Sequence, residues 1–151
     1  MAGLIVIDTS VFVIDLRYKR DKDFSVNRTF LERAVEGRSA ATTIFNLLEV
    51  CGILSFNLNE RQLRELFHYF PQRYQVEMLP HDSLESSLPA FTTGELFNMI
   101  LKKFSFGDAL IAAAIEKHVR GAECFVSWNA QHFKGKLSVP SLTPRQFLRS
   151  H

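Results

Sequence analysis

The chain alternates between two patterns of apolar and polar positions. Short apolar runs rich in β-branched residues, such as Leu4–Ile7, predict strands covered on both faces, as in a parallel sheet. Longer segments with apolar residues at helical spacing lie between them. The pattern predicts strands at residues 4–7, 39–42, 75–79, 123–128 and 137–142, and helices at 10–19, 26–37, 42–58, 59–70, 92–104, 105–118 and 143–148.

Helix-start signals support several of these boundaries. Asn59 with Gln62, and Thr143 with Gln146, have the spacing of capping boxes, and Pro144 occupies a first helical position. Strands that alternate with helices predict an α/β fold with a mainly parallel central sheet.

Length and composition indicate an ordinary globular protein. The 151 residues, 46% hydrophobic and 23% charged, predict one domain, residues 1–151, rather than a disordered or fibrous chain. Cys51 and Cys124 lie in apolar segments without C-x-x-C spacing, which argues against a zinc site or a disulfide framework. The apolar run before Asp8 is too short for a signal peptide or a membrane span. We therefore expect a reducing, cytoplasmic location.

Positive charge is gathered in three places, although the formal net charge is only +2. That total is too small to indicate a nucleic-acid partner, and any one cluster could be a solvated face. The clusters gain meaning only if they surround a site. They are Arg17, Lys19, Arg20 and Lys22; Lys102 and Lys103; and Lys134 and Lys136.

Two polar side chains follow predicted strands directly. Asp8 comes after the first strand and Asn129 after the segment ending at Trp128. Ligands of open α/β sheets bind outside the carboxyl ends of the strands, so both residues are candidates for a site. Each also has an ordinary structural explanation as a turn residue, and either Asp8 or Ser10 could cap the next helix.

Two further carboxylates lie on predicted helices. Asp108 follows Ser105 at capping-box spacing, where the helix dipole stabilises a carboxylate by ~0.3–1 kcal/mol, but such a group can still bind a metal. Glu49 lies between Phe45 and Ile53 on its own helical face. If that face is buried, an unpartnered charge there costs several kcal/mol, which favours a functional role.

Brought together, these four side chains would form an oxygen-rich site. Two carboxylates ~4 Å apart repel by roughly 4 kcal/mol at a protein surface, so the cluster would call for a cation. Without imidazole or thiolate in the set, the expected ion is Mg²⁺ or Mn²⁺. Such an ion, surrounded by Lys and Arg, can promote phosphodiester hydrolysis.

Five segments of the chain, taken in order, resemble a PIN domain of the small kind found in VapC-like toxins. They are "LIVIDTSVF", "TTIFNLLEVCGI", "FSFGDALIAAAIE", "CFVSWNAQHF" and "LTPRQFL". The resemblance covers nearly the whole chain. It implies a three-layer α/β/α sandwich around a mainly parallel sheet, and Mg²⁺- or Mn²⁺-dependent endoribonuclease activity.

The resemblance also assigns roles to residues. It places Asp8, Glu49 and Asp108 on the family's first three acidic positions and Asn129 on the fourth, where Asp is commoner. His132 stands where many relatives carry another Asp. Both departures make the predicted site less acidic, so weaker metal binding is expected.

Asp8 and Asp108 are then expected to bind the ion directly, Glu49 to hold or deprotonate the attacking water, and Asn129 to orient ligand or water. Thr9 and Ser10 would steer Asp8 or cap the next helix. RNA contacts are assigned to Thr9, Ser10, Lys102, Lys103 and Lys134. The resemblance also implies a homodimer and, in the toxin subset, an antitoxin partner.

A second hypothesis is a catalytically weak PIN-like module that binds RNA or a protein. Other enzyme classes have less support. A haloacid-dehalogenase-like phosphatase needs a second Asp where Ser10 stands, and a receiver-type phosphoacceptor needs an acidic pair at the end of the first strand. Neither G-x-G-x-x-G nor a Walker loop is present.

Overall fold

The computed structural model describes residues 3–151. Its strands are β1 (Leu4–Ile7), β2 (Ser39–Thr43), β3 (Val76–Leu79), β4 (Ala122–Val126) and β5 (Ser141–Leu142). Its helices are α1 (Thr9–Arg17), α2 (Phe24–Ala34), α3 (Ile44–Leu54), α4 (Glu60–Tyr74), α5 (Thr93–Leu101), α6 (Phe106–His118), α7 (Ala130–Phe133) and α8 (Pro144–Ser150).

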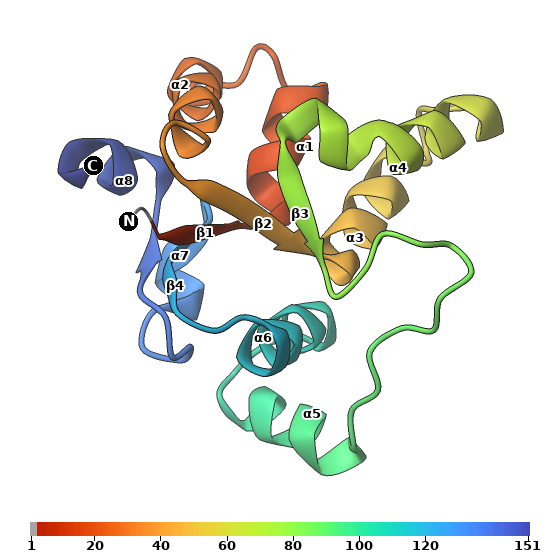
Figure 1. Cartoon of the computed structure of the whole chain (residues 1–151), viewed down its shortest axis with the longest axis vertical. Coiled ribbons are helices and arrows are strands. Elements are labelled where there is room, and N and C mark those ends of the chain that lie inside the picture. The colour runs from red at the N-terminus through yellow and green to blue at the C-terminus, as the bar shows by residue number, and fades with distance from the viewer. Residues whose placement is uncertain (1–2) are drawn as a thin grey trace.

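The strands form one parallel sheet in the order β3-β2-β1-β4-β5 (Figure 1). The first strand in the chain therefore lies in the middle of the sheet. Connections from β1 run outward in both directions, so β2 and β4 flank β1 although more than 75 residues separate them in sequence. The carboxyl ends of β1, β2 and β4 consequently meet at one edge.

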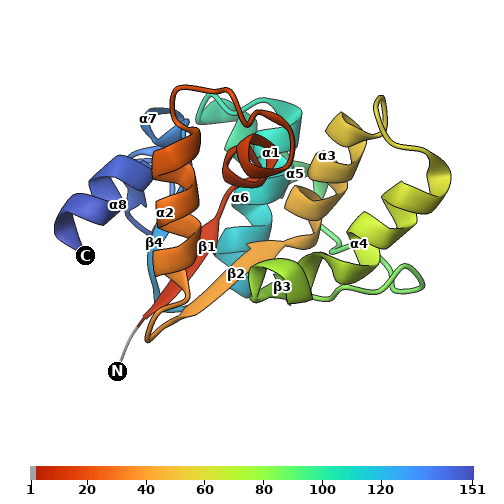
Figure 2. The ribbon, with the colours of Figure 1, turned by 90° about the horizontal axis from the view of Figure 1, so that it is seen from above.

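Helices cover both faces of the sheet (Figures 1 and 2). Alternation along β1 shows the two layers: Ile5 and Ile7 pack into the core beneath α1–α4 and α8, whereas Val6 packs against α6 on the other face. The predicted three-layer α/β/α sandwich with a parallel sheet is confirmed.

The capping boxes at Asn59 and Thr143 are present as predicted. A third box at Thr43 was not predicted, and it explains why α3 starts at Ile44 rather than at residue 42. Other boundaries were wrong as well. The helices predicted at 10–19, 26–37, 59–70 and 92–104 run over Thr9–Arg17, Phe24–Ala34, Glu60–Tyr74 and Thr93–Leu101. The helix predicted to residue 58 ends at Leu54, β4 ends at Val126 instead of Trp128, and only two residues of segment 137–142 pair as a strand. The short helix α7 was missed.

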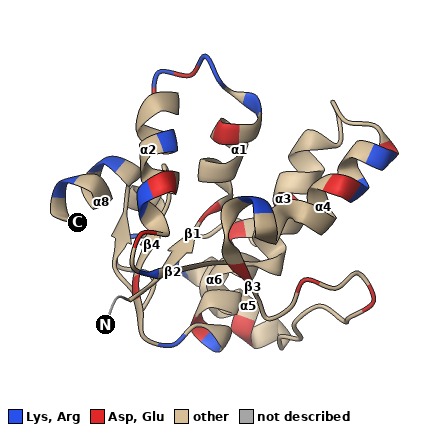
Figure 3. Ribbon diagram, turned by 45° about the horizontal axis from the view of Figure 1, so that its top comes forward, with Lys and Arg blue, Asp and Glu red and all other residues tan. Residues whose placement is uncertain are grey.

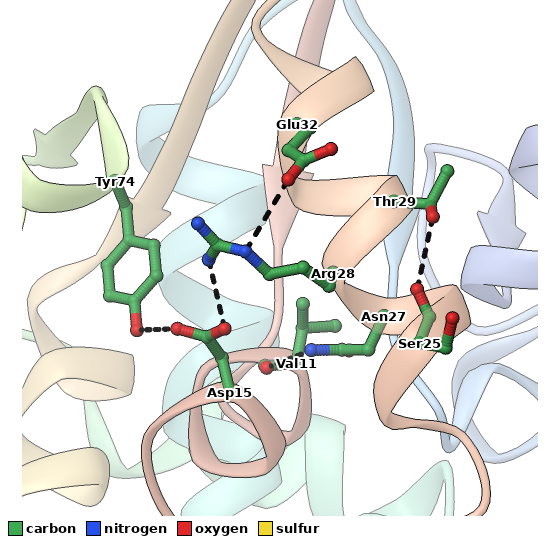
Figure 4. A network of polar contacts seen from close by, with 8 residues as sticks. All are labelled: Val11, Asp15, Ser25, Asn27, Arg28, Thr29, Glu32 and Tyr74. Atoms are coloured by element: carbon green, nitrogen blue, oxygen red, sulfur yellow. Dashed lines mark hydrogen bonds and ion pairs between the residues drawn. The ribbon is translucent and has the colours of Figure 1, made fainter. Parts of the chain in front are cut away.

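A network of polar contacts joins α1, α2 and α4, which cover the same face of the sheet (Figure 4). Asp15, only 5% exposed, accepts hydrogen bonds from the Tyr74 hydroxyl at 2.6 Å and from Arg28 at 3.0 Å. Burial and the neighbouring carboxylate raise the pKa of Tyr74, so its hydroxyl stays a donor. Asn27 adds a bond from its amide to the Val11 carbonyl at 2.9 Å.

Replacing Tyr74 with Phe should lower the free energy of unfolding by ~1–3 kcal/mol, because a buried carboxylate loses a donor. Urea denaturation would measure the change. Tyr69→Phe is the matched control, since Tyr69 is 57% exposed and its hydroxyl has no hydrogen-bond partner among residues 3–151. Equal stability of the two variants would contradict a stabilising role for the Tyr74 bond.

Across residues 3–151, every helix is too short or too polar to cross a lipid bilayer.

Candidate functional site

Asp8 is the first residue after the central strand, and its backbone N–H donates to the Val126 carbonyl of β4 at 2.9 Å. It occupies the N-cap position of α1, but its carboxylate makes no capping hydrogen bond. Asp8 is thus the N-cap residue that the structural explanation expected, but its side chain does not cap the helix. Ser10 does not cap α1 either; its hydroxyl accepts the Trp128 N–H at 3.1 Å.

Each oxygen of the Asp8 carboxylate is held by a buried side chain. Asn46 Nδ2 donates to Oδ1 at 3.1 Å, and the Ser127 hydroxyl donates to Oδ2 at 2.6 Å. Both donors are fully buried, and Asp8 itself is 5% exposed. The carboxylate is therefore fixed from β2–α3 on one side and from the end of β4 on the other.

Asn46 is itself oriented by its surroundings. Its Nδ2 also donates to Thr9 Oγ1 at 2.9 Å, while its Oδ1 accepts the Thr43 hydroxyl at 2.7 Å. These bonds fix which end of the amide faces Asp8. Sequence reasoning missed Asn46 and Ser127, and the available signal was a single amide on the otherwise apolar first turn of α3.

The environment raises the pKa of Asp8 to about 6. Burial is the largest cause, because it disfavours the charged form. The hydrogen bonds from Ser127 and from the Thr9 backbone act in the opposite direction, and the charges of Glu49 and Asp108 raise the pKa further. Three carboxylates from distant parts of the chain thus lie close enough to interact.

Glu49 lies on α3 beside the first turn of α6. A methyl group added at Gly107 would lie 3.5 Å from Glu49 Oε2, at ordinary contact distance, so the Glu49 carboxylate lies beside the residue that precedes Asp108. The expectation that its helix face is buried was wrong. Glu49 is only partly buried, and Leu48 and Ile53 on either side are each 39% exposed. The residue therefore needs no buried partner to offset its charge.

Asp108 forms half of the predicted capping box. Its backbone N–H donates to Ser105 Oγ at 3.3 Å, but the side chain does not return a bond to the cap residue. The carboxylate is 28% exposed, and its Oδ2 lies 3.4 Å from His132 Nε2. It is thus available to a ligand.

Asn129 lies three residues beyond the end of β4, not directly after it. Its backbone N–H donates to Ser127 Oγ at 2.9 Å, the same hydroxyl that donates to Asp8. Its side chain is exposed. Trp128, beside it, is partly buried and donates from Nε1 to Asn27 Oδ1 at 2.7 Å, a packing role rather than a base-stacking one.

The other predicted contact residues differ in their placement. Thr9 is buried against Asn46. Lys102 donates to the Lys136 carbonyl at 3.3 Å and lines an open hollow with residues of the last turns of α6. Lys103 and Lys134 are exposed. Figure 3 shows further basic residues on the loop between α1 and α2 and on α8.

We refer to Asp8, Glu49, Asp108 and Asn129 as the carboxyl-end site. In the described part of the chain, no three His, Cys, Asp or Glu side chains form a preassembled metal-binding group. The chemistry of the donors nevertheless fits a hard divalent cation, because three carboxylates repel one another and a bound cation would relieve the charge interaction that raises the pKa of Asp8.

Comparison with solved structures bears on the fold. VapBC2 from Rickettsia felis, bound to a DNA fragment from its promoter, matches with a TM-score of 0.57 at 18% identity, over 93% of this chain and 98% of that chain. VapBC-1 from nontypeable Haemophilus influenzae matches with a TM-score of 0.60 at 11% identity, over 94% and 98%. FitAB bound to the IR36 DNA fragment matches with a TM-score of 0.56 at 14% identity, over 93% and 94%.

The chain has a VapC-like PIN fold. No family model and no curated protein matches the sequence. The likeness to the VapBC and FitAB structures is therefore a likeness of fold.

Proposed function

We propose that the protein is a metal-dependent endoribonuclease that hydrolyses RNA phosphodiester bonds. The observation that supports it most is the buried Asp8 carboxylate, fixed through both oxygens and acted on by the charges of Glu49 and Asp108. Burying a charged carboxylate beside other carboxylates lowers the stability of a fold, and groups perturbed in this way are characteristic of functional sites. The VapC-like PIN fold adds support from an independent direction.

Each residue of the carboxyl-end site takes one role in this proposal. Asp8 and Asp108 bind Mg²⁺ or Mn²⁺, Glu49 holds or deprotonates the attacking water, and Asn129 orients ligand or water. Asn46 and Ser127 keep the Asp8 carboxylate in place. A bound cation would lower the pKa of a water molecule and stabilise negative charge on the leaving oxygen.

RNA is the proposed substrate, with exposed basic side chains near the site as contacts for its phosphates. Lys103 and Lys134 are exposed, on the segments that lead into α6 and out of α7. Neutralising phosphates releases counterions, so binding would weaken as salt rises.

We also propose that the protein is the toxin of a toxin-antitoxin pair and forms a homodimer. VapBC and FitAB complexes supply the analogy for an antitoxin protein partner. This chain has exposed apolar side chains on and beside α5 that could contact a protein partner. They are Phe97, Leu101 and Phe106, which are between 56% and 63% exposed.

A binding module with little catalysis is the alternative. The observation that favours it is Asn129, whose exposed amide stands where a fourth carboxylate would strengthen metal binding. A module of this kind would need no ion of its own.

Calorimetric titration of the metal-free protein with MnCl₂ separates the two functions. We expect a saturable site in the wild type, and at least ~10-fold weaker binding in Asp108→Asn, because a direct carboxylate ligand is lost. Asp82→Asn is the matched control, since Asp82 is an exposed loop residue with no ion pair among residues 3–151. A wild type that binds no Mn²⁺ would favour the binding module.

A further inference from the structure

His132 places an imidazole beside Asp108 of the carboxyl-end site. Its Nε2 lies 3.4 Å from Asp108 Oδ2, and the side chain is 44% exposed. Within residues 3–151 neither ring nitrogen has a hydrogen-bond partner. His132 Nε2 and Asp108 Oδ2 therefore lie at ion-pair distance, with no hydrogen bond between them.

The ring is held in place by aromatic contacts. Its centroid lies 5.9 Å from the Phe104 ring, at 70° to it, and 5.8 Å from the Phe133 ring, at 90°. Phe104 and Phe133 are buried, at 4% and 1% exposure. Two fixed rings thus limit the directions in which the imidazole can point.

The segment that carries His132 is also fastened to Asp8. The His132 N–H donates to the Asn129 carbonyl at 2.9 Å, and the Asn129 N–H donates to Ser127, whose hydroxyl binds Asp8. One short segment therefore holds Asp8 through Ser127 and reaches Asp108 through His132.

The N–O separation helps to distinguish the roles open to this histidine. Two adjacent ligands of an octahedral ion with bonds of ~2.1 Å are roughly 3 Å apart, which is close to the 3.4 Å between His132 Nε2 and Asp108 Oδ2. A cation that bound between these atoms would need little movement of either side chain. An ion pair between a protonated His132 and Asp108 is the alternative, and it would place no imidazole nitrogen on the metal.

We propose that His132 supplies an imidazole nitrogen to the divalent cation, beside Asp108. This inference rests on the proposed metal-dependent function. Mg²⁺ is a hard ion that prefers oxygen, whereas transition-metal ions accept imidazole readily. His132 therefore shifts the ion preference of the site from Mg²⁺ toward Mn²⁺.

Electron spin echo envelope modulation of the Mn²⁺-loaded protein tests the inference directly. The wild type should show coupling of the metal to a directly bound ¹⁴N nucleus, and this pattern should change to that of ¹⁵N when the protein is made with ¹⁵N-histidine. The coupling should be lost in His132→Asn, because the Asn amide ligates through oxygen. His68→Asn, a change at an exposed histidine of α4, should leave the coupling intact.

Titrations with MnCl₂ and MgCl₂ give a second readout. The ratio of the Mn²⁺ to the Mg²⁺ affinity should fall roughly 10-fold in His132→Asn and stay unchanged in His68→Asn. Mn²⁺ bound to the wild type without nitrogen coupling would overturn the role of His132 and leave the metal-dependent function standing. A wild type that binds no Mn²⁺ at all would overturn both.

Discussion

Asp108→Asn should reduce the rate of RNA cleavage by roughly 100- to 1,000-fold, and Asp8→Asn should do the same. Each change removes a negative charge that stabilises the cation, and fixed electrostatic groups of this kind contribute differences of that size to enzymatic rates. A labelled RNA incubated with Mn²⁺, with samples taken over time and separated on a denaturing gel, would give the rates.

Asp108 is the cleaner position of the two for this experiment. Its carboxylate is 28% exposed and accepts no hydrogen bond among residues 3–151, so the amide should disturb the fold little. Asp82→Asn is again the control and should cleave at the wild-type rate. Cleavage by Asp108→Asn at the wild-type rate, or cleavage by the wild type in excess EDTA, would contradict the metal-dependent mechanism.

Asp8→Asn should also stabilise the metal-free fold above pH 6. The pKa of Asp8 is raised from 3.8 to about 6 in the folded protein, mainly by burial. Near pH 3 the carboxyl is protonated in both the folded and the unfolded chain, so it makes no difference to stability. As the pH rises from 4 to 6, the unfolded chain releases this proton first, and the free energy of unfolding falls.

The loss is complete above pH 6, where it amounts to ~3 kcal/mol as an upper bound. Asn carries no charge, so the variant escapes this loss. Its melting temperature in EDTA should exceed that of the wild type by roughly 5 °C at pH 7.5, and the difference should shrink toward pH 4. Calorimetric melts across this range would measure it.

Two outcomes bear on this prediction. A difference in melting temperature that does not vary with pH would contradict the burial of the Asp8 charge. Added Mn²⁺ should raise the melting temperature of the wild type more than that of Asp8→Asn, because an ion that binds only the folded state stabilises it. Together the two results would show a carboxylate kept for function at the expense of stability.

The approach of Asp8 to Glu49 and Asp108 could be expected from the sequence, because parallel topology makes distant residues neighbours. Asp8 follows the first strand and Asn129 follows the segment that contains β4, so strand-helix alternation suggested that both lie at the carboxyl edge of the sheet. The direction of the side chains could not be predicted. The structure shows that Asp8 makes no capping bond and that Asp108 completes only half of a capping box.

Glu49 shows where pattern reasoning went wrong. The apolar residues around it indicated a buried face, yet Leu48 and Ile53 are exposed, because α3 packs on the sheet through Leu47, Val50 and Leu54. When a helix is apolar on more than one side, its sequence does not show which apolar residues face the core and which face outward.

The amino-acid sequence by itself determined most of the elements, and the starts of the predicted helices to within two residues, because apolar periodicity and the caps at Asn59 and Thr143 act over a few residues. Only the tertiary structure decided the strand order and the partners of Asp8. Asn46 and Ser127, which hold that carboxylate, lie 38 and 119 residues away along the chain. Bonds across such distances depend on how the strands assemble, since no local pattern specifies which polar side chains will meet in the core.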